Sequence, residues 1–196
     1  MAGFLVWSYI NGRIRRLEIA RRRRPYLLVG GLPQDQRRRL LESVRYQDAI
    51  ASGTKLAVAL VLLLGIRPAR ITRLRLDDVE HISGTVSISI AKELLLPEPL
   101  AELAAQAVAD RAARRLLAPV QDRHWLYPGA PTGTPLCPSA LVRRLAAVDV
   151  TITPARTGAL TALPQRLPPP VLAELTGMDP ATATRWRSTV SASNAH

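Results

Sequence analysis

The hydrophobic residues of this chain recur mostly at the three- and four-residue spacing of α-helices. In the segment after Pro33, Leu40, Leu41 and Val44 share one face, while Arg37 to Arg39 lie mostly off that face. Such a pattern is typical of an amphipathic helix that packs one side against a core. The regular part of the chain is therefore expected to begin near this helix.

The most apolar segment, residues 55–64, is hydrophobic on almost every side. This pattern indicates a helix that is buried nearly all round. We expect residues 53–54, a Gly-Thr pair, to break the chain before it. Pro68 suits the first turn of a following helix, in which Ile71 and Leu74 would face the core.

Strict alternation of apolar and polar residues occurs clearly in one segment. Val86, Ile88 and Ile90 alternate with serines, which predicts a strand exposed on one face. Residues 91–93 would form the turn, and Leu94 to Leu96 the returning strand. The segment is thus expected to form an antiparallel hairpin.

The remaining patterns are helical. Aromatic residues make up only 4% of the chain, so the core must consist of Leu, Ala, Val and Ile, which favours helices over a β-sandwich. Further helices are predicted near residues 99–119, 139–148 and 156–163, with two short helices around 177–179. The expected fold class is mainly α with a small antiparallel β-hairpin sheet (α+β).

Charge adds information about partners. The 196 residues carry a net charge of +12, and all 27 basic residues except Lys55 and Lys92 are arginine. Codon bias in a GC-rich genome explains arginine over lysine but not the positive sum, so a nucleic acid partner is favoured. The apolar run that ends at Ile66 is about 11 residues long, well short of the ~20 that span a bilayer. We expect no membrane contact and a cytoplasmic protein, associated with the nucleoid when bound to DNA.

Three regions are expected along the chain. Residues 1–31 form a basic N-terminal arm or remnant linker that contains Arg21, Arg22, Arg23 and Arg24. This segment either lies along DNA phosphates or is a solvated linker, and both readings stay open. Residues 32–190 form the folded domain, and residues 191–196 a fraying tail.

The sequence contains no pattern of residues that indicates a metal or cofactor site. Cys137 is the single cysteine, which excludes an intrachain disulfide and a cysteine zinc cluster. His81 and His124 lack metal-ligand spacing. We expect no metal and no cofactor.

The order of motifs resembles the catalytic domain of tyrosine recombinases, the phage integrase family, across roughly residues 32–190. A buried helix runs into a G-x-R motif at Gly65 and Arg67, and Leu74 and Asp78 match the rest of the family pattern. Lys92 falls in the hairpin turn. A later T-P-x-R motif places Arg156 where the family has its second arginine.

The resemblance implies roles for three residues. In this family a tyrosine hydroxyl attacks a DNA phosphate and forms a covalent link that stores the bond energy for rejoining. Arg67 and Arg156 would bind the non-bridging oxygens and stabilise the transition state. Lys92 would protonate the departing 5′ oxygen. The implied partners are double-stranded DNA and other recombinase protomers.

Several positions depart from the family pattern. Thr153 and Met178 stand where active-site histidines are expected, and Trp186 stands near the place of the nucleophilic tyrosine. Arg70 replaces a usual acidic residue. The four tyrosines of the chain all precede the second arginine: Tyr9, Tyr26, Tyr46 and Tyr127. Because an indole cannot attack phosphorus, we expect a degenerate, N-terminally truncated integrase that grips DNA without cutting it.

A helix-turn-helix regulator is the alternative interpretation. Residues 170–188 fit two helices around a turn, with Ala173, Gly177, Ala183 and Trp186 at their interface. An RNA-binding or purely structural protein ranks third. Candidate DNA contacts in these interpretations are Arg70 and Arg73 beside the first arginine, and Thr182, Thr184, Arg185 and Arg187 in the last helix.

Overall fold

The structure is a computed structural model, and it describes the chain from Gly30 onward with short gaps. The described residues are 30–82, 85–89, 93–96, 98, 100–115, 119–163, 168–176 and 179–193. The helices are α2 (Gln34–Arg45), α3 (Ser52–Leu64), α4 (Pro68–Ile71), α5 (Leu100–Arg115), α6 (Pro138–Ala146), α7 (Ile152–Ala162), α8 (Pro169–Thr176) and α9 (Pro180–Ser193), with 3₁₀ turns at Leu76–Asp78 and Val120–Asp122. The strands are β1 (Val79–Ile82), β2 (Thr85–Ser89) and β3 (Glu93–Leu95).

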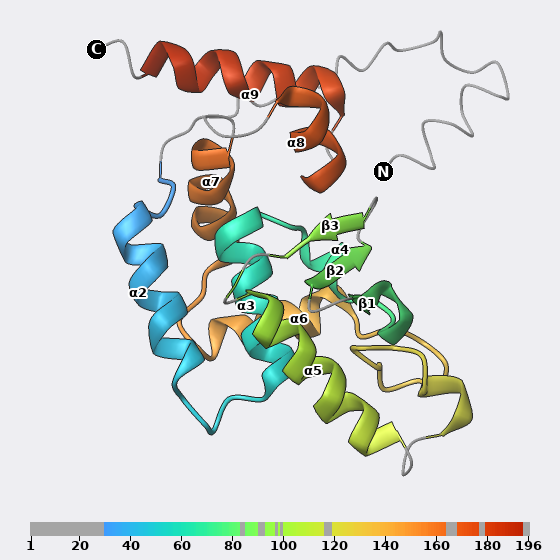
Figure 1. Ribbon diagram of the computed structural model, residues 1–196. Coiled ribbons are helices and arrows are strands. Elements are labelled where there is room, and N and C mark those ends of the chain that lie inside the picture. The colour runs from blue at the N-terminus through green and yellow to red at the C-terminus, as the bar shows by residue number, and fades with distance from the viewer. Residues whose placement is uncertain are drawn as a thin grey trace, which may run out of the picture.

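Helix α3 is the centre of the core, as its apolar pattern predicts. Residues 56–62 are fully buried, and α2, α5, α6 and α7 all pack against this helix (Figure 1). The predicted break at residues 53–54 is wrong, because both residues lie in the first turn of α3. The carbonyl of Ala51 accepts the amides of Thr54 and Lys55 at 2.8 and 3.1 Å, so the helix begins at Ser52.

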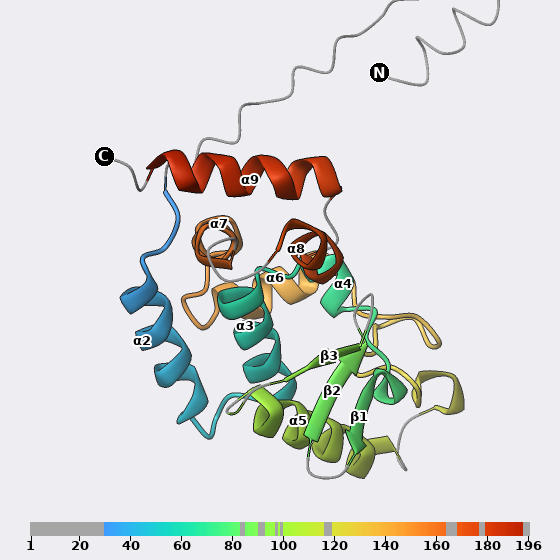
Figure 2. The same ribbon diagram turned by 45° about the horizontal axis from the view of Figure 1, so that its top comes forward.

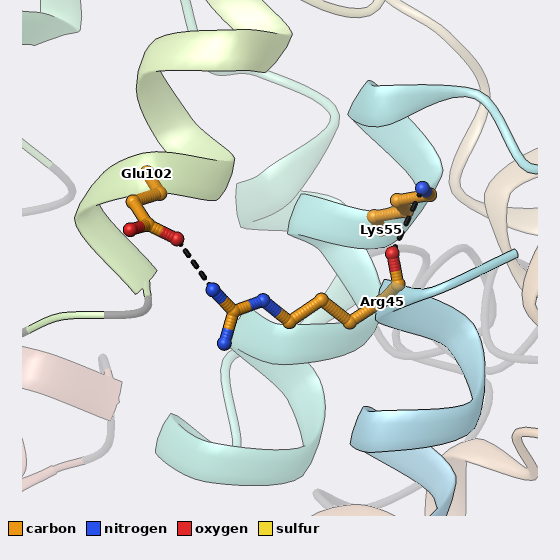
Figure 3. A network of polar contacts seen from close by, with 3 residues as sticks. All are labelled: Arg45, Lys55 and Glu102. Carbon is orange, nitrogen blue, oxygen red and sulfur yellow. Dashed lines mark hydrogen bonds and ion pairs between the residues drawn. The ribbon is translucent and has the colours of Figure 1, made fainter. Parts of the chain in front are cut away.

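Two basic residues of this region are tied to their neighbours by polar contacts. The Lys55 ammonium group is buried and donates to the carbonyl of Arg45 at 2.9 Å. The Arg45 guanidinium forms an ion pair with Glu102 on α5 (Figure 3). These contacts join the end of α2 to α3 and α5. Lys55 therefore belongs to the framework of the fold.

Helix α2 forms where the sequence predicts it, but the predicted exposure of one of its arginines is wrong. Val44 is buried and Leu40 and Leu41 pack against the core as expected, whereas Arg37 is only 7% exposed. Its guanidinium donates to the carbonyl of Leu62 at 2.8 Å. That carbonyl lies in the last turn of α3, where carbonyls have no helical partner, so a buried arginine takes the place of a cap.

The sheet has three antiparallel strands in the order β1-β2-β3, which confirms the hairpin and adds a strand. Val79 of β1 pairs with Ile88, and Leu95 of β3 pairs with Ser87. Val86 and Ile88 are buried as predicted, and β2 packs against α5. Ser87, expected on an exposed face, is also buried. Strand β1 was not predicted, because its four residues are too few to show a clear alternation of apolar and polar positions. Residues 90–92, which include Lys92, lie outside the described residues.

The C-terminal helices form a second, smaller core. Leu172 and Ala173 of α8 pack with Ala183 of α9 and with Leu163 at the end of α7. Helix α9 lies across α7 and α8 (Figure 2). The predicted pair of helices is confirmed, although α9 is longer than expected and includes residues 191–193, which the sequence predicted to fray. Met178 and residues 194–196 lie outside the described part.

Across the residues that the structure describes, no helix combines the length and the apolar character needed to cross a bilayer.

Candidate phosphate-binding site

The end of α3 determines where the first candidate arginine lies. Gly65 has a left-handed backbone conformation (φ 63°), and its amide and that of Ile66 bond back to Val61 and Leu60. Glycine adopts this conformation without the steric cost that other residues meet. The chain then turns, and Arg67 becomes the exposed residue that precedes α4. Pro68 occupies the first turn of α4, as predicted.

Helix α7 brings the second candidate arginine to the same place. Arg156 is half-buried, and its Nε donates to the carbonyl of Gly65 at 2.8 Å. A side chain on Gly65 would lie 3.0 Å from the Cγ of Leu160, which shows how closely α7 approaches the end of α3. The hydrogen bond holds one edge of the Arg156 guanidinium and leaves its remaining donors for another group.

The two arginines lie close enough to repel each other. Burial lowers the pKa of Arg156, and the nearby positive charge of Arg67 lowers it further. Among the described residues, neither arginine forms an ion pair with a carboxylate. Two neighbouring cations without a counter-charge favour an anion between them, and guanidinium groups suit phosphate oxygens in particular.

The structure places the other predicted site residues as follows. Thr153 is exposed on α7, one helical turn before Arg156, and Arg73 is exposed after α4. Asp78 accepts the amide of Arg75 at 2.7 Å, so it caps the 3₁₀ turn before β1. Half-buried Arg70 lies in the last turn of α4 and already has a contact. Of the remaining predicted residues, Thr182, Thr184 and Arg185 lie on α9. Trp186 and Arg187 also belong to α9, but their side chains are outside the description. Arg21 to Arg24, Lys92 and Met178 lie outside the described residues.

Two tyrosines lie in the described part of the chain, and neither is near the arginine pair. Tyr127 is buried, and its hydroxyl donates to the carbonyl of Gly53 in the first turn of α3. Arg67 follows the opposite end of that helix, whose 13 residues span about 20 Å. Tyr46 follows α2 at the level of Lys55, whose ammonium group contacts the preceding carbonyl. Neither hydroxyl can reach a phosphate held by Arg67 and Arg156.

A contact that the sequence did not reveal positions α7. The Leu32 amide donates to the carbonyl of Pro154 at 2.9 Å, and residues 31–32 lie directly on Gly158. A Cβ atom at Gly158 would come within 2.2 Å of the Leu32 carbonyl oxygen. The small residue is needed because two backbones touch there. The only signal in the sequence was the pair of glycines, Gly31 and Gly158, far apart along the chain.

Replacing Gly65 with alanine is expected to lower the free energy of unfolding by about 1 to 2 kcal/mol, because an L-residue is strained in the left-handed conformation. The added methyl group would also crowd Leu160. Denaturant titration followed by circular dichroism measures the change. An unchanged midpoint would show that the end of α3 relaxes without cost.

Comparisons with known proteins support the fold assignment. Three solved structures of recombinases share the fold. They are the XerH site-specific recombinase bound to difH substrate before cleavage (17% identity, TM-score 0.57), XerA recombinase (16%, 0.58), and XerH bound to palindromic difH substrate after cleavage (18%, 0.60). Each comparison covers 80% of this chain and 49%, 59% and 48% of the other chain, respectively. The chain therefore spans about half the length of these proteins. No protein-family model and no curated protein matches the sequence.

The described residues thus have the fold of a tyrosine recombinase catalytic domain. This confirms the fold that the sequence motifs implied. Identities of 16 to 18% establish the architecture alone, so the activity of this chain has to be argued from its own residues.

Proposed function

We propose that this chain binds double-stranded DNA through Arg67 and Arg156 and acts in site-specific recombination or integration without cleaving strands by itself. The observation that carries the proposal is the arginine pair. The two guanidinium groups come from segments about ninety residues apart, repel each other, and have no carboxylate counter-charge among the described residues. A DNA phosphate supplies the charge that this arrangement favours.

Charge and fold add support. The net charge of +12 favours association with a polyanion of any sequence, and each phosphate that is neutralised makes binding more sensitive to salt. The XerH structures that share the fold are complexes with difH substrate and with palindromic difH substrate. Lys92 and the arginines at positions 21–24 remain proposed phosphate contacts, and other recombinase protomers remain proposed partners.

The first test of this function is direct. Fluorescence anisotropy with a labelled duplex should show binding whose logarithmic affinity falls linearly with the logarithm of the salt concentration. Binding that is absent at low salt, or that does not respond to salt, would overturn the proposal.

Incubation with nicked duplex DNA is expected to leave no covalent protein–DNA complex. Of the two tyrosines in the described part of the chain, Tyr127 donates to Gly53 at the far end of α3 and Tyr46 lies near that end. Tyr9 and Tyr26 lie outside the described residues, in the segment before the proposed recombinase-like domain, and Trp186 has no nucleophilic atom. A denaturing gel with labelled DNA measures the result, and an active tyrosine recombinase on its own nicked site serves as the positive control. A shifted band that survives denaturant with Trp186 intact would show that a nucleophile exists and would refute the proposed lack of cleavage.

Helix-turn-helix recognition is the second candidate function. Helices α8 and α9 do pack through Ala173 and Ala183, as that interpretation requires, and Thr184 and Arg185 are exposed on α9. The Thr184 hydroxyl donates to the carbonyl of Pro180 in its own helix. A regulator of this kind would bind one duplex at least ~10³-fold more tightly than random DNA and would lose that preference in Arg185→Ala. Binding through phosphate contacts at Arg67 and Arg156 predicts instead only a small difference in affinity between that duplex and random DNA.

A further inference from the structure

We propose that a second anion site lies at the opposite end of α3 and binds a small phosphate-bearing ligand. A cavity of about 230 Å³ lies where the first turn of α3 meets α5, α6 and the segment around Tyr127. Three arginines line it: Arg111 and Arg114 from α5, and Arg144 from α6. This site is separate from the arginine pair at Gly65 and does not depend on the DNA-binding proposal.

The guanidinium of Arg111 is held in place by the protein. Its Nε donates to the carbonyl of Trp125 at 3.0 Å, and one terminal nitrogen donates to the carbonyl of Asp122 at 2.8 Å. Both partners are neutral carbonyls, and among the described residues no carboxylate forms an ion pair with this guanidinium. Because the two bonds fix the plane of the group, little conformational entropy is lost when its remaining donors bind a ligand.

The other two arginines complete a positive rim. Arg144 lies near enough to the buried Tyr127 phenol for its charge to lower the pKa of that phenol, against the larger effect of burial, which raises it. Arg114 and Arg144 are exposed, and neither forms an ion pair with a carboxylate among the described residues. Among the described residues that line the cavity, three are arginines and one, Asp110, is acidic, so their summed charge is positive.

The backbone adds donors at the same place. Ser52 and Gly53 line the cavity in the first turn of α3, where amides have no acceptor within their own helix. The positive end of the α3 dipole adds to the charge of the three arginines. A phosphate dianion offers enough oxygen acceptors for several guanidinium groups at once, whereas a carboxylate offers only two oxygens.

The size of the cavity limits the ligand. Sites for drug-sized molecules usually enclose about 300 Å³ or more, so this cavity suits a phosphate group with few attached atoms. The arginine pair at the other end of α3 is about 20 Å away along a helix of 13 residues, so one phosphate cannot occupy both places.

Isothermal titration of the full chain with pyrophosphate at low ionic strength tests the site. In the background of Arg67→Ala with Arg156→Ala, which removes the other proposed phosphate site, we expect one saturable site. Its affinity should fall about tenfold in Arg144→Ala and in Arg114→Ala, because each substitution removes a charged donor. Arg143→Ala is the matched control, since Arg143 is the neighbouring exposed arginine of α6 and does not line the cavity. Asp110→Asn should bind more tightly, and acetate should not bind.

The results distinguish a specific anion site in this cavity from general attraction of anions to a positively charged surface. Equal weakening in Arg143→Ala and Arg144→Ala, or no saturation by millimolar pyrophosphate, would overturn the proposal. A second titration in the presence of excess duplex DNA identifies the source of the phosphate. An unchanged affinity for pyrophosphate is expected for a small-ligand site, whereas full competition by DNA would reassign the cavity to a backbone phosphate and contradict the proposal.

Discussion

The double substitution Arg67→Ala with Arg156→Ala is expected to weaken duplex DNA binding by about 10² to 10⁴-fold, since hydrogen bonds to charged groups contribute about 1.5 to 3 kcal/mol each. Arg156 is already oriented by the Gly65 carbonyl, so little conformational entropy is lost when it binds a phosphate. Losing one phosphate contact should also reduce the salt slope by about 0.9. Anisotropy titrations at several salt concentrations measure both quantities.

A control that removes the same charge distinguishes a site from general attraction. Arg39→Ala with Arg143→Ala also removes two exposed arginines, one from α2 and one from α6. Simple electrostatic attraction predicts equal losses for the two double variants, and that result would contradict the proposed site. If instead Arg185→Ala produces the large loss, α9 is the DNA-contacting element and the helix-turn-helix interpretation gains support.

Replacing Gly158 with alanine is expected to cost about 3 kcal/mol of the free energy of unfolding, at the upper end of what forced overpacking usually costs. The new methyl group would overlap the Leu32 carbonyl oxygen, which is backbone and cannot rotate away. Residues 31–32 would have to leave α7, and the hydrogen bond from Leu32 to Pro154 would be lost. Guanidinium titration followed by circular dichroism measures the change.

Gly53→Ala is the matched control for that substitution. Its methyl group would meet only the Tyr127 ring, at an ordinary 3.5 Å, and alanine is the better helix former in the first turn of α3. Its stability should therefore stay the same or rise by up to about 1 kcal/mol. Similar losses in both variants would show that close backbone contact at Gly158 is not what holds α7 in place.

Local patterns predicted most of the secondary structure. An uninterrupted apolar run must be buried on all sides, so residues 55–64 indicated the central helix, and Pro68 indicated the start of the next one. Alternation at Val86 and Ile88 indicated a strand because side chains of a strand point to opposite faces in turn. The motif order implied the recombinase fold, which the structural comparisons confirm.

Burial of polar residues could not be predicted in this way. Arg37 and Ser87 carry polar groups that local patterns assign to the surface, yet both are buried. Arg37 is stabilised inside by the Leu62 carbonyl, a partner 25 residues away. A polar group can be buried when another segment of the chain supplies a hydrogen-bond partner for it. The local sequence around the polar residue does not show whether such a partner will be present.

The sequence by itself determined most of the helices, the hairpin and the excess of positive charge, and it offered Arg67 and Arg156 as candidates for phosphate binding. Only the tertiary structure decided that Arg156 lies against Gly65 beside Arg67, and that Tyr127 faces the other end of α3. It also brought Arg111, Arg114 and Arg144 around one cavity. The reason is physical: local periodicity reports which face of an element is buried, whereas distances between segments depend on packing, here on the backbone contact at Gly158 and the left-handed turn at Gly65.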